Sequence, residues 1–158
     1  LLAGLVALWP AATGNPPAAV ARAEASGLAQ AYTPDRLAEL RAEGAPVFVN
    51  VTAAWCITCK VNERVVLQAP DVQQAFRDKG VTILTADWTN RNDMIAADLA
   101  RFGRNGVPFY VLYPTGGQDP ITFPELLTKD IVFNALYQHS AALPSCEALP
   151  PNSTLGAK

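Results

Sequence analysis

The chain has 158 residues, of which 50% are hydrophobic and 16% charged, and its formal net charge at pH 7 is −2. This length suits one domain with a buried core, and the near-neutral charge argues against a nucleic-acid partner or a basic membrane-surface patch. Three cysteines are too few for a disulfide framework, and the single histidine, His139, leaves no ligand set for structural zinc. We therefore expect neither a bound metal nor another cofactor.

The first nine residues form a continuous apolar run that ends at Pro10. The run is shorter than the roughly 20 residues that cross a bilayer, and it has neither an initiator Met nor the basic start of a signal peptide. We predict that residues 1–9 are the end of a truncated transmembrane helix; a buried N-terminal helix is the alternative. Residues 10–30, rich in Ala, Pro and Gly, are predicted to be a linker.

The rest of the chain alternates between strand and helix signals. Thr33 and Pro34 suit the N-cap and first position of a helix, and Gly44 suits its end. Apolar periodicity and turn residues then predict, in chain order, a buried strand 47–52, a helix from 57 to near 70, a short helix 71–80, a strand 81–86, a helix 93–102, a strand 107–113, a short strand 121–123 and a helix from 129 to about 141.

This alternation predicts an α/β fold with a central mixed sheet of about four strands and helices on both faces. The predicted globular domain spans residues 31–142, and residues 143–158 are predicted to be a flexible tail. The turn after the strand 47–52 lies at the carboxyl end of a central parallel strand. Open α/β sheets place their functional sites at such ends.

The strongest functional signal is the pair Cys56 and Cys59, which directly follows that strand and opens a helix. Sulfurs at positions i and i+3 of a helix lie on one face, close enough for a disulfide. Free N–H groups at a helix N-terminus favour a thiolate on Cys56, which makes it the candidate nucleophile. Cys59, one turn deeper, would then resolve the mixed disulfide. A pair of buried structural cysteines is the alternative.

Four stretches of the sequence match one family pattern: Ala54-Trp55-Cys56-Ile57-Thr58-Cys59-Lys60, Glu63, Asp87-Trp88-Thr89-Asn90 and Phe102-Gly103-Arg104-Asn105-Gly106-Val107-Pro108. Over residues 31–142 the chain resembles the thioredoxin fold, and more narrowly the C-terminal periplasmic domain of DsbD-type thiol:disulfide interchange proteins and their ScsB-like relatives. The resemblance implies a protein-disulfide reductase in a periplasmic domain of an inner-membrane protein. Its redox group would be the Cys56–Cys59 disulfide, with no added cofactor.

The resemblance also implies partners on both sides of this electron transfer. Electrons would come from a transmembrane domain of the same parent protein and go to periplasmic disulfide-bearing proteins. These acceptors could include another thioredoxin-like domain, a thiol peroxidase or a factor of cytochrome c biogenesis. Cys146 in the tail is either a free thiol or an intermolecular contact.

Val107, Pro108 and Trp55 are the candidate substrate-binding residues. The resemblance implies a cis Pro108 that faces the cysteine pair. In that form the proline would pack against the disulfide and leave the backbone at Val107 free to pair with an extended substrate. A trans proline at the start of an edge strand is the alternative. Trp55 would form an apolar rim for docking, or it would be a core aromatic.

Proton transfer poses a separate question, because thioredoxins usually carry an acidic residue six positions before the first cysteine. This chain has Asn50 there, and an asparagine amide does not act as an acid or base near neutral pH. Glu63 lies seven residues after Cys56 on the same helix face, and its carboxylate could accept the proton of Cys59. A solvated surface glutamate is the alternative.

Two other functions remain open at this point. A periplasmic oxidase or isomerase would use the same fold in the opposite direction, and the direction depends on a reduction potential that the sequence does not set. A copper(I)-handling protein would bind the metal through the two thiolates, although no Met or His cluster accompanies them. An inert binding module is the weakest reading, since exposed thiols at a helix N-terminus invite oxidation.

Overall fold

The computed structural model describes residues 29–138. The predicted end of a transmembrane helix, the tail, His139 and Cys146 lie outside the described residues, as does most of the predicted linker. Within residues 29–138, none of the helices has the length and apolar character needed to cross a membrane.

Strands and helices alternate along the described chain, as predicted. In chain order the elements are β1 (Ala29–Ala31), α2 (Pro34–Ala42), β2 (Val47–Thr52), α3 (Ile57–Asn62), the π-helical segment η1 (Glu63–Leu67), α4 (Pro70–Asp78), β3 (Thr82–Asp87), α5 (Asp93–Arg101), β4 (Phe109–Tyr113), the 3₁₀ turn η2 (Thr115–Gly117), β5 (Ile121–Thr122) and α6 (Lys129–Gln138).

The sheet has five strands in the order β1-β3-β2-β4-β5, so the prediction of about four strands was one short. β1, β3 and β2 run parallel to one another, whereas β4 is antiparallel to both β2 and β5. The missed strand is β1, whose Ala29 pairs with Ile83 of β3. It holds only three residues, two of them alanine, and therefore carries no β-branched or alternating pattern. Consequently Ala29 and Gln30 belong to the sheet and not to the predicted linker.

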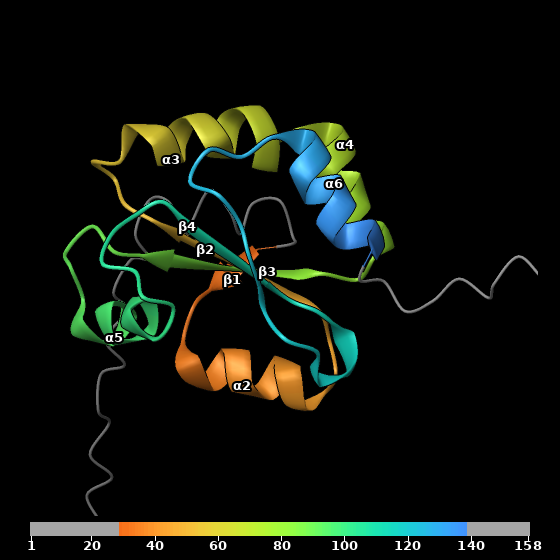
Figure 1. The fold of residues 1–158 in the computed structure, drawn as a ribbon, viewed down its shortest axis with the longest axis horizontal. Helices are drawn as coiled ribbons and strands as arrows, with labels where there is room; N and C mark the ends of the chain where they lie inside the picture. Colours follow the sequence, from red (N-terminus) through yellow and green to blue (C-terminus); the bar gives the residue numbers. More distant parts are fainter. Residues whose placement is uncertain (1–28, 139–158) are drawn as a thin grey trace, which may run out of the picture.

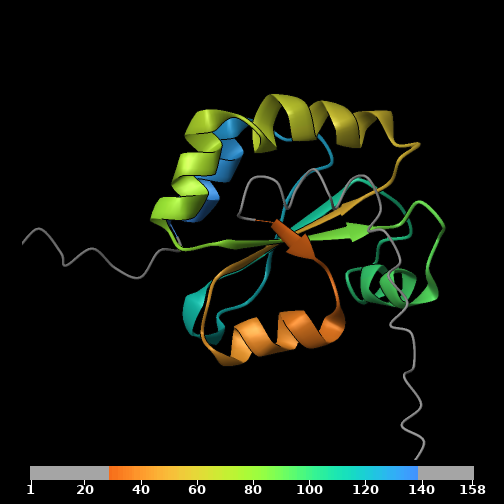
Figure 2. The same cartoon turned by 180° about the vertical axis from the view of Figure 1, so that it is seen from behind.

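Helices cover both faces of the sheet (Figures 1 and 2): α3, α4 and α6 lie on one face, and α2 and α5 on the other. β2 is central and buried along its whole length, which agrees with its continuous apolar run. On the α3 face, Phe48 of β2 packs against Phe76, Tyr110 and Phe123, with ring centroids 5.3, 6.1 and 5.4 Å away. Burial of such a side chain contributes about 1.5–3 kcal/mol, so this cluster anchors α4, which carries Phe76, to the sheet.

The predicted regular helix after the cysteines contains a π-helical segment. α3 gives way at Glu63 to η1, in which Gln68 N–H donates to Glu63 O at 2.8 Å. A π segment adds a residue to one turn and so changes which side chains face the sheet. The helical segment ends at Leu67, near Pro70 as predicted, and Pro70 occupies the first turn of α4.

Candidate redox site

Cys56 and Cys59 form a disulfide whose Cα atoms are 5.3 Å apart. Cys56 is the N-cap of α3, and its Sγ accepts a hydrogen bond from the Cys59 backbone N–H at 3.2 Å. Cys56 is 6% exposed and Cys59 is 0% exposed. Both residues are buried, and Cys56 is the less deeply buried of the two.

The opposite wall of the site is the segment before β4. The Val107–Pro108 peptide bond is cis, as the resemblance implies. Val107 packs against the apolar cluster formed by Ala53, Cys56 and Cys59. The segment reaches the disulfide because β4 is antiparallel to β2, with Phe109 opposite Val51. Pro108 is buried, and β4 begins one residue after it, so the predicted strand 107–113 started two residues too early.

The other flank is the loop that follows β3. β3 runs parallel to β2 with Asp87 opposite Thr52, so both strands end at the same edge of the sheet. Thr89 connects this loop by hydrogen bonds to the turn between β2 and α3, called the redox turn below. Its Oγ1 accepts a hydrogen bond from Ala54 N–H at 2.8 Å, and its carbonyl oxygen accepts one from Trp55 Nε1–H at 3.1 Å. Asp87 in turn accepts hydrogen bonds from both the Thr89 N–H and its hydroxyl.

Two tryptophans stand at this flank with different exposures. Trp55 is 49% exposed beside Cys56, which is the position of a rim residue and not of a core aromatic. Trp88 is buried, donates from Nε1–H to Asn92 O at 3.1 Å and lies 6.4 Å from the Trp55 ring. Trp88 is therefore packed in the core and also lies next to the turn that carries Cys56.

Glu63 lies in direct contact with the residue that replaces the usual buried acid. Asn50 Nδ2–H donates to Glu63 Oε1 at 3.2 Å. Asn50 is 5% exposed, and its Oδ1 accepts no hydrogen bond from the described residues. Tyr110 lies opposite Asn50 in the sheet, and burial raises its pKa to about 12. Glu63 is therefore the carboxylate in contact with Asn50.

Within residues 29–138, His, Cys, Asp and Glu side chains form no group of three or more that could hold a metal ion. The redox-active group of this region is the disulfide.

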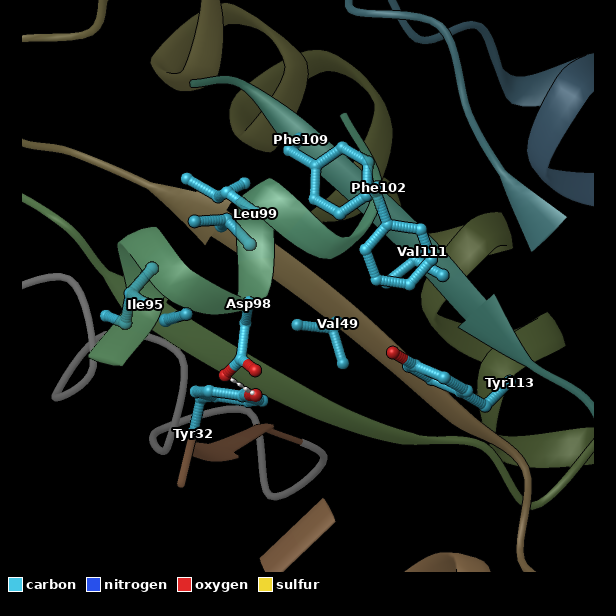
Figure 3. A pocket seen from close by; sticks show the side chains of 11 residues that line it. Tyr32, Val49, Ile95, Asp98, Leu99, Phe102, Phe109, Val111 and Tyr113 are labelled. Carbon is cyan, nitrogen blue, oxygen red and sulfur yellow. Dashed lines mark hydrogen bonds between the residues drawn. The ribbon is translucent and has the colours of Figure 1, made fainter. Parts of the chain in front are cut away.

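A small apolar cavity lies on the opposite face of the sheet (Figure 3), lined mainly by side chains from α5, β2 and β4. Two of its polar groups are paired: the Tyr32 hydroxyl donates to Asp98 Oδ2 at 2.6 Å, and Asp98 also pairs with Arg101. Burial, together with the hydrogen bond to Asp98, raises the pKa of Tyr32 above its usual value.

Comparisons with known proteins give one consistent result. Residues 28–115 match a family model described as thioredoxin-like. The chain is 34% identical over 79 residues to the thiol:disulfide interchange protein DsbD of Klebsiella pneumoniae, a match that covers 50% of this chain and 13% of that protein. It is 39% identical over 83 residues to DsbD 1 of Pseudomonas aeruginosa, covering 52% of this chain and 14% of that protein.

A solved structure shares the fold. The C-terminal domain of DsbD from Neisseria meningitidis in the oxidised form superposes with a TM-score of 0.56 at 24% identity, covering 69% of this chain and 97% of that domain. This likeness confirms the predicted thioredoxin-like architecture. The matches to the two curated relatives, in contrast, span only a small part of the length of those proteins.

Proposed function

This chain belongs to the thioredoxin-like family, and we propose that it is a protein-disulfide reductase module. In this proposal it receives electrons from a membrane-embedded domain of its parent protein and passes them to disulfide-bearing proteins in the periplasm. The observation that carries the proposal is the Cys56–Cys59 disulfide at the first turn of α3, with Cys56 slightly exposed and Cys59 fully buried. The names of the relatives, thiol:disulfide interchange proteins, support it.

Cys56 is the proposed nucleophile. In the reduced domain its thiolate, stabilised by the N–H of Cys59, attacks one sulfur of a partner disulfide. The partner's S–S bond breaks, a mixed disulfide forms at Cys56, and the partner's second sulfur leaves as a thiolate that takes up a proton.

Cys59 is the proposed resolving residue. It loses its proton and attacks the Cys56 Sγ, so that the mixed disulfide breaks and the partner departs with two thiols. Two electrons have then moved to the partner, and the disulfide seen in the structure has formed again. A dithiol of the donor domain restores the reduced form by the same exchange in reverse.

Trp55, Val107 and Pro108 are the proposed substrate-binding residues. Trp55 supplies exposed apolar area on one side of Cys56, and Val107 packs against the cysteine cluster on the other side. Val107 precedes β4, so its backbone lies outside the strand ladder. An extended substrate segment can therefore pair with it while the substrate's disulfide lies over Cys56.

The direction of electron flow is tested by the reduction potential of the full chain. Equilibration with graded ratios of reduced and oxidised dithiothreitol, followed by alkylation of free thiols, gives the ratio of dithiol to disulfide. We expect a potential near that of thioredoxin, about −270 mV, which suits an electron donor. A potential near about −120 mV would instead assign the domain to oxidation of its partners.

Glu63 is the proposed base for Cys59. It lies one turn after Cys59, where its Oε1 is held by Asn50. We expect Glu63→Gln to slow the resolving step about 10²-fold at neutral pH, because the glutamine amide does not accept the thiol proton. Above about pH 9, where solvent removes the proton from an ordinary thiol, the variant and wild-type rates should converge.

The measurement is the pH dependence of mixed-disulfide decay in a stopped-flow assay. Glu39→Gln, on the opposite face of the sheet, is the matched control and should keep the wild-type profile. Superimposable profiles for Glu63→Gln and the wild type would remove Glu63 from the mechanism.

A further inference from the structure

Arg91 stands beside the redox turn in an unusual backbone conformation. Its φ of 52° lies in the left-handed region, where non-glycine residues are uncommon. Its guanidinium carbon is 5.5 Å from the ring centroid of Trp55 and 5.6 Å from that of Trp88. Contacts of this kind attract a cation to the faces of aromatic rings, so the two indoles hold the charge of Arg91 next to the residue that precedes Cys56.

Hydrogen bonds hold in place the two indole rings that Arg91 contacts. Trp55 and Trp88 donate their indole N–H groups to Thr89 O and Asn92 O, and the Arg91 N–H donates to Trp88 O at 3.0 Å. Figure 1 shows the loops after β2 and β3 at the same end of the sheet, where these residues meet. A guanidinium held in this way loses little side-chain freedom when it binds an anion.

This charge is free to pair with another molecule. Within the described chain, no carboxylate lies within ion-pair distance of Arg91, and the same holds for Lys60 and Arg64 on the redox helix. Lys60 lies one turn after Cys56, on the same helix face.

Three carboxylates near the redox site have partners within the chain. Asp87 accepts hydrogen bonds from Thr89, Glu63 accepts one from Asn50, and Glu125 pairs with Arg104 at 3.5 Å. The surface beside Cys56 therefore combines unpaired cations with exposed apolar side chains, namely Trp55 and Ile57.

We propose that Arg91, Trp55 and Lys60 form a docking surface for an extended segment of a disulfide-bearing protein that carries Asp or Glu beside its reactive cysteine. The inference rests on the proposed function and adds the chemistry of the partner. The apolar rim would accept side chains of the segment, while Arg91 pairs with the carboxylate. Complementary charges of this kind increase specificity and the association rate more than they increase affinity.

The test uses the reduced full chain and three disulfides. Two are synthetic peptides with one disulfide each, identical except that the residues flanking the cysteines are Glu in one and Lys in the other. The third is hydroxyethyl disulfide, which is neutral and small. At low salt we expect the wild type to reduce the Glu peptide about fivefold faster than the Lys peptide, the scale of an exposed ion pair. Near 1 M salt, where the Debye length is about 3 Å, the ratio should approach one.

Arg91→Glu should bring the ratio of the Glu-peptide rate to the Lys-peptide rate close to one, because the charge of Lys60 remains, and Arg91→Gln should lower this ratio to an intermediate value. The ratio is the readout because any change in the intrinsic reactivity of Cys56 cancels in it. Arg77→Glu is the control: it makes the same charge change on α4, at an exposed arginine that also lacks a carboxylate partner. It should keep the wild-type ratio.

Two failures are distinguishable. If the wild type reduces hydroxyethyl disulfide but treats both peptides alike, or if Arg77→Glu changes the ratio as much as Arg91→Glu, the docking surface is wrong and the proposed function stands. If the reduced wild type reacts with none of the three disulfides, the proposed function itself fails.

Discussion

Cys56→Ala is expected to reduce the rate of disulfide exchange by at least about 10³-fold, the scale of losing a catalytic nucleophile. Cys59 remains in this variant, but it is fully buried behind Cys56 and cannot reach a partner's sulfur. The rate is measured as the consumption of hydroxyethyl disulfide by the full chain, with dithiothreitol present as the reductant and its direct reaction subtracted.

Cys146→Ala is the matched control, because it removes the third thiol by the same substitution. Cys146 lies outside the described residues, and we expect its removal to leave the exchange rate near that of the wild type. Loss of exchange in Cys146→Ala, or its survival in Cys56→Ala, would move the reactive thiol away from the turn after β2.

Local patterns were sufficient to predict the scaffold of the site. The β-branched run 47–52 was predicted as a buried strand, and β2 has those bounds. The cysteine pair at the following helix start was predicted to lie close enough for a disulfide, and it forms one. Both predictions depend on short-range physics, namely burial of a continuous apolar run and the spacing of side chains on a helix.

Other parts of the fold left no local signal. β1 is stabilised by its pairing with β3 and not by its own alanine-rich residues, so only the assembled sheet reveals it. The change from α3 to the π segment at Glu63 is likewise invisible in a sequence that keeps valines at helical spacing. Tertiary contacts outweigh local propensity at both places.

The candidate site was likewise only partly predictable from local sequence patterns. The helical position of Glu63 indicated that it faces the redox pair, but its hydrogen bond with Asn50 depends on how the helix is placed over β2. Arg91 was not predicted at all. The position of its guanidinium depends on two tryptophans from separate loops that meet at one edge of the sheet. The only sequence signal near Arg91 was the preceding Asp87-Trp88-Thr89-Asn90 stretch, which carries the family resemblance.

The second large effect is expected for Cys59→Ser. Without its sulfur, the buried position cannot resolve the mixed disulfide, so the exchange should stop after the first step with the partner attached to Cys56. The variant is made in the Cys146→Ala background, which leaves Cys56 as the single cysteine. Cys56→Ser with Cys146→Ala is the matched control, because it keeps the fully buried thiol and removes the less deeply buried one.

The identity and lifetime of this adduct test the central claim most directly. After reaction with hydroxyethyl disulfide, intact mass and peptide mapping of the Cys59→Ser chain should show one mercaptoethanol per molecule on Cys56. This adduct should be stable, whereas the chain with both redox cysteines should release it by forming its own disulfide. Absence of the adduct, or equal labelling of the control variant at Cys59, would contradict the assignment of Cys56 as the nucleophile.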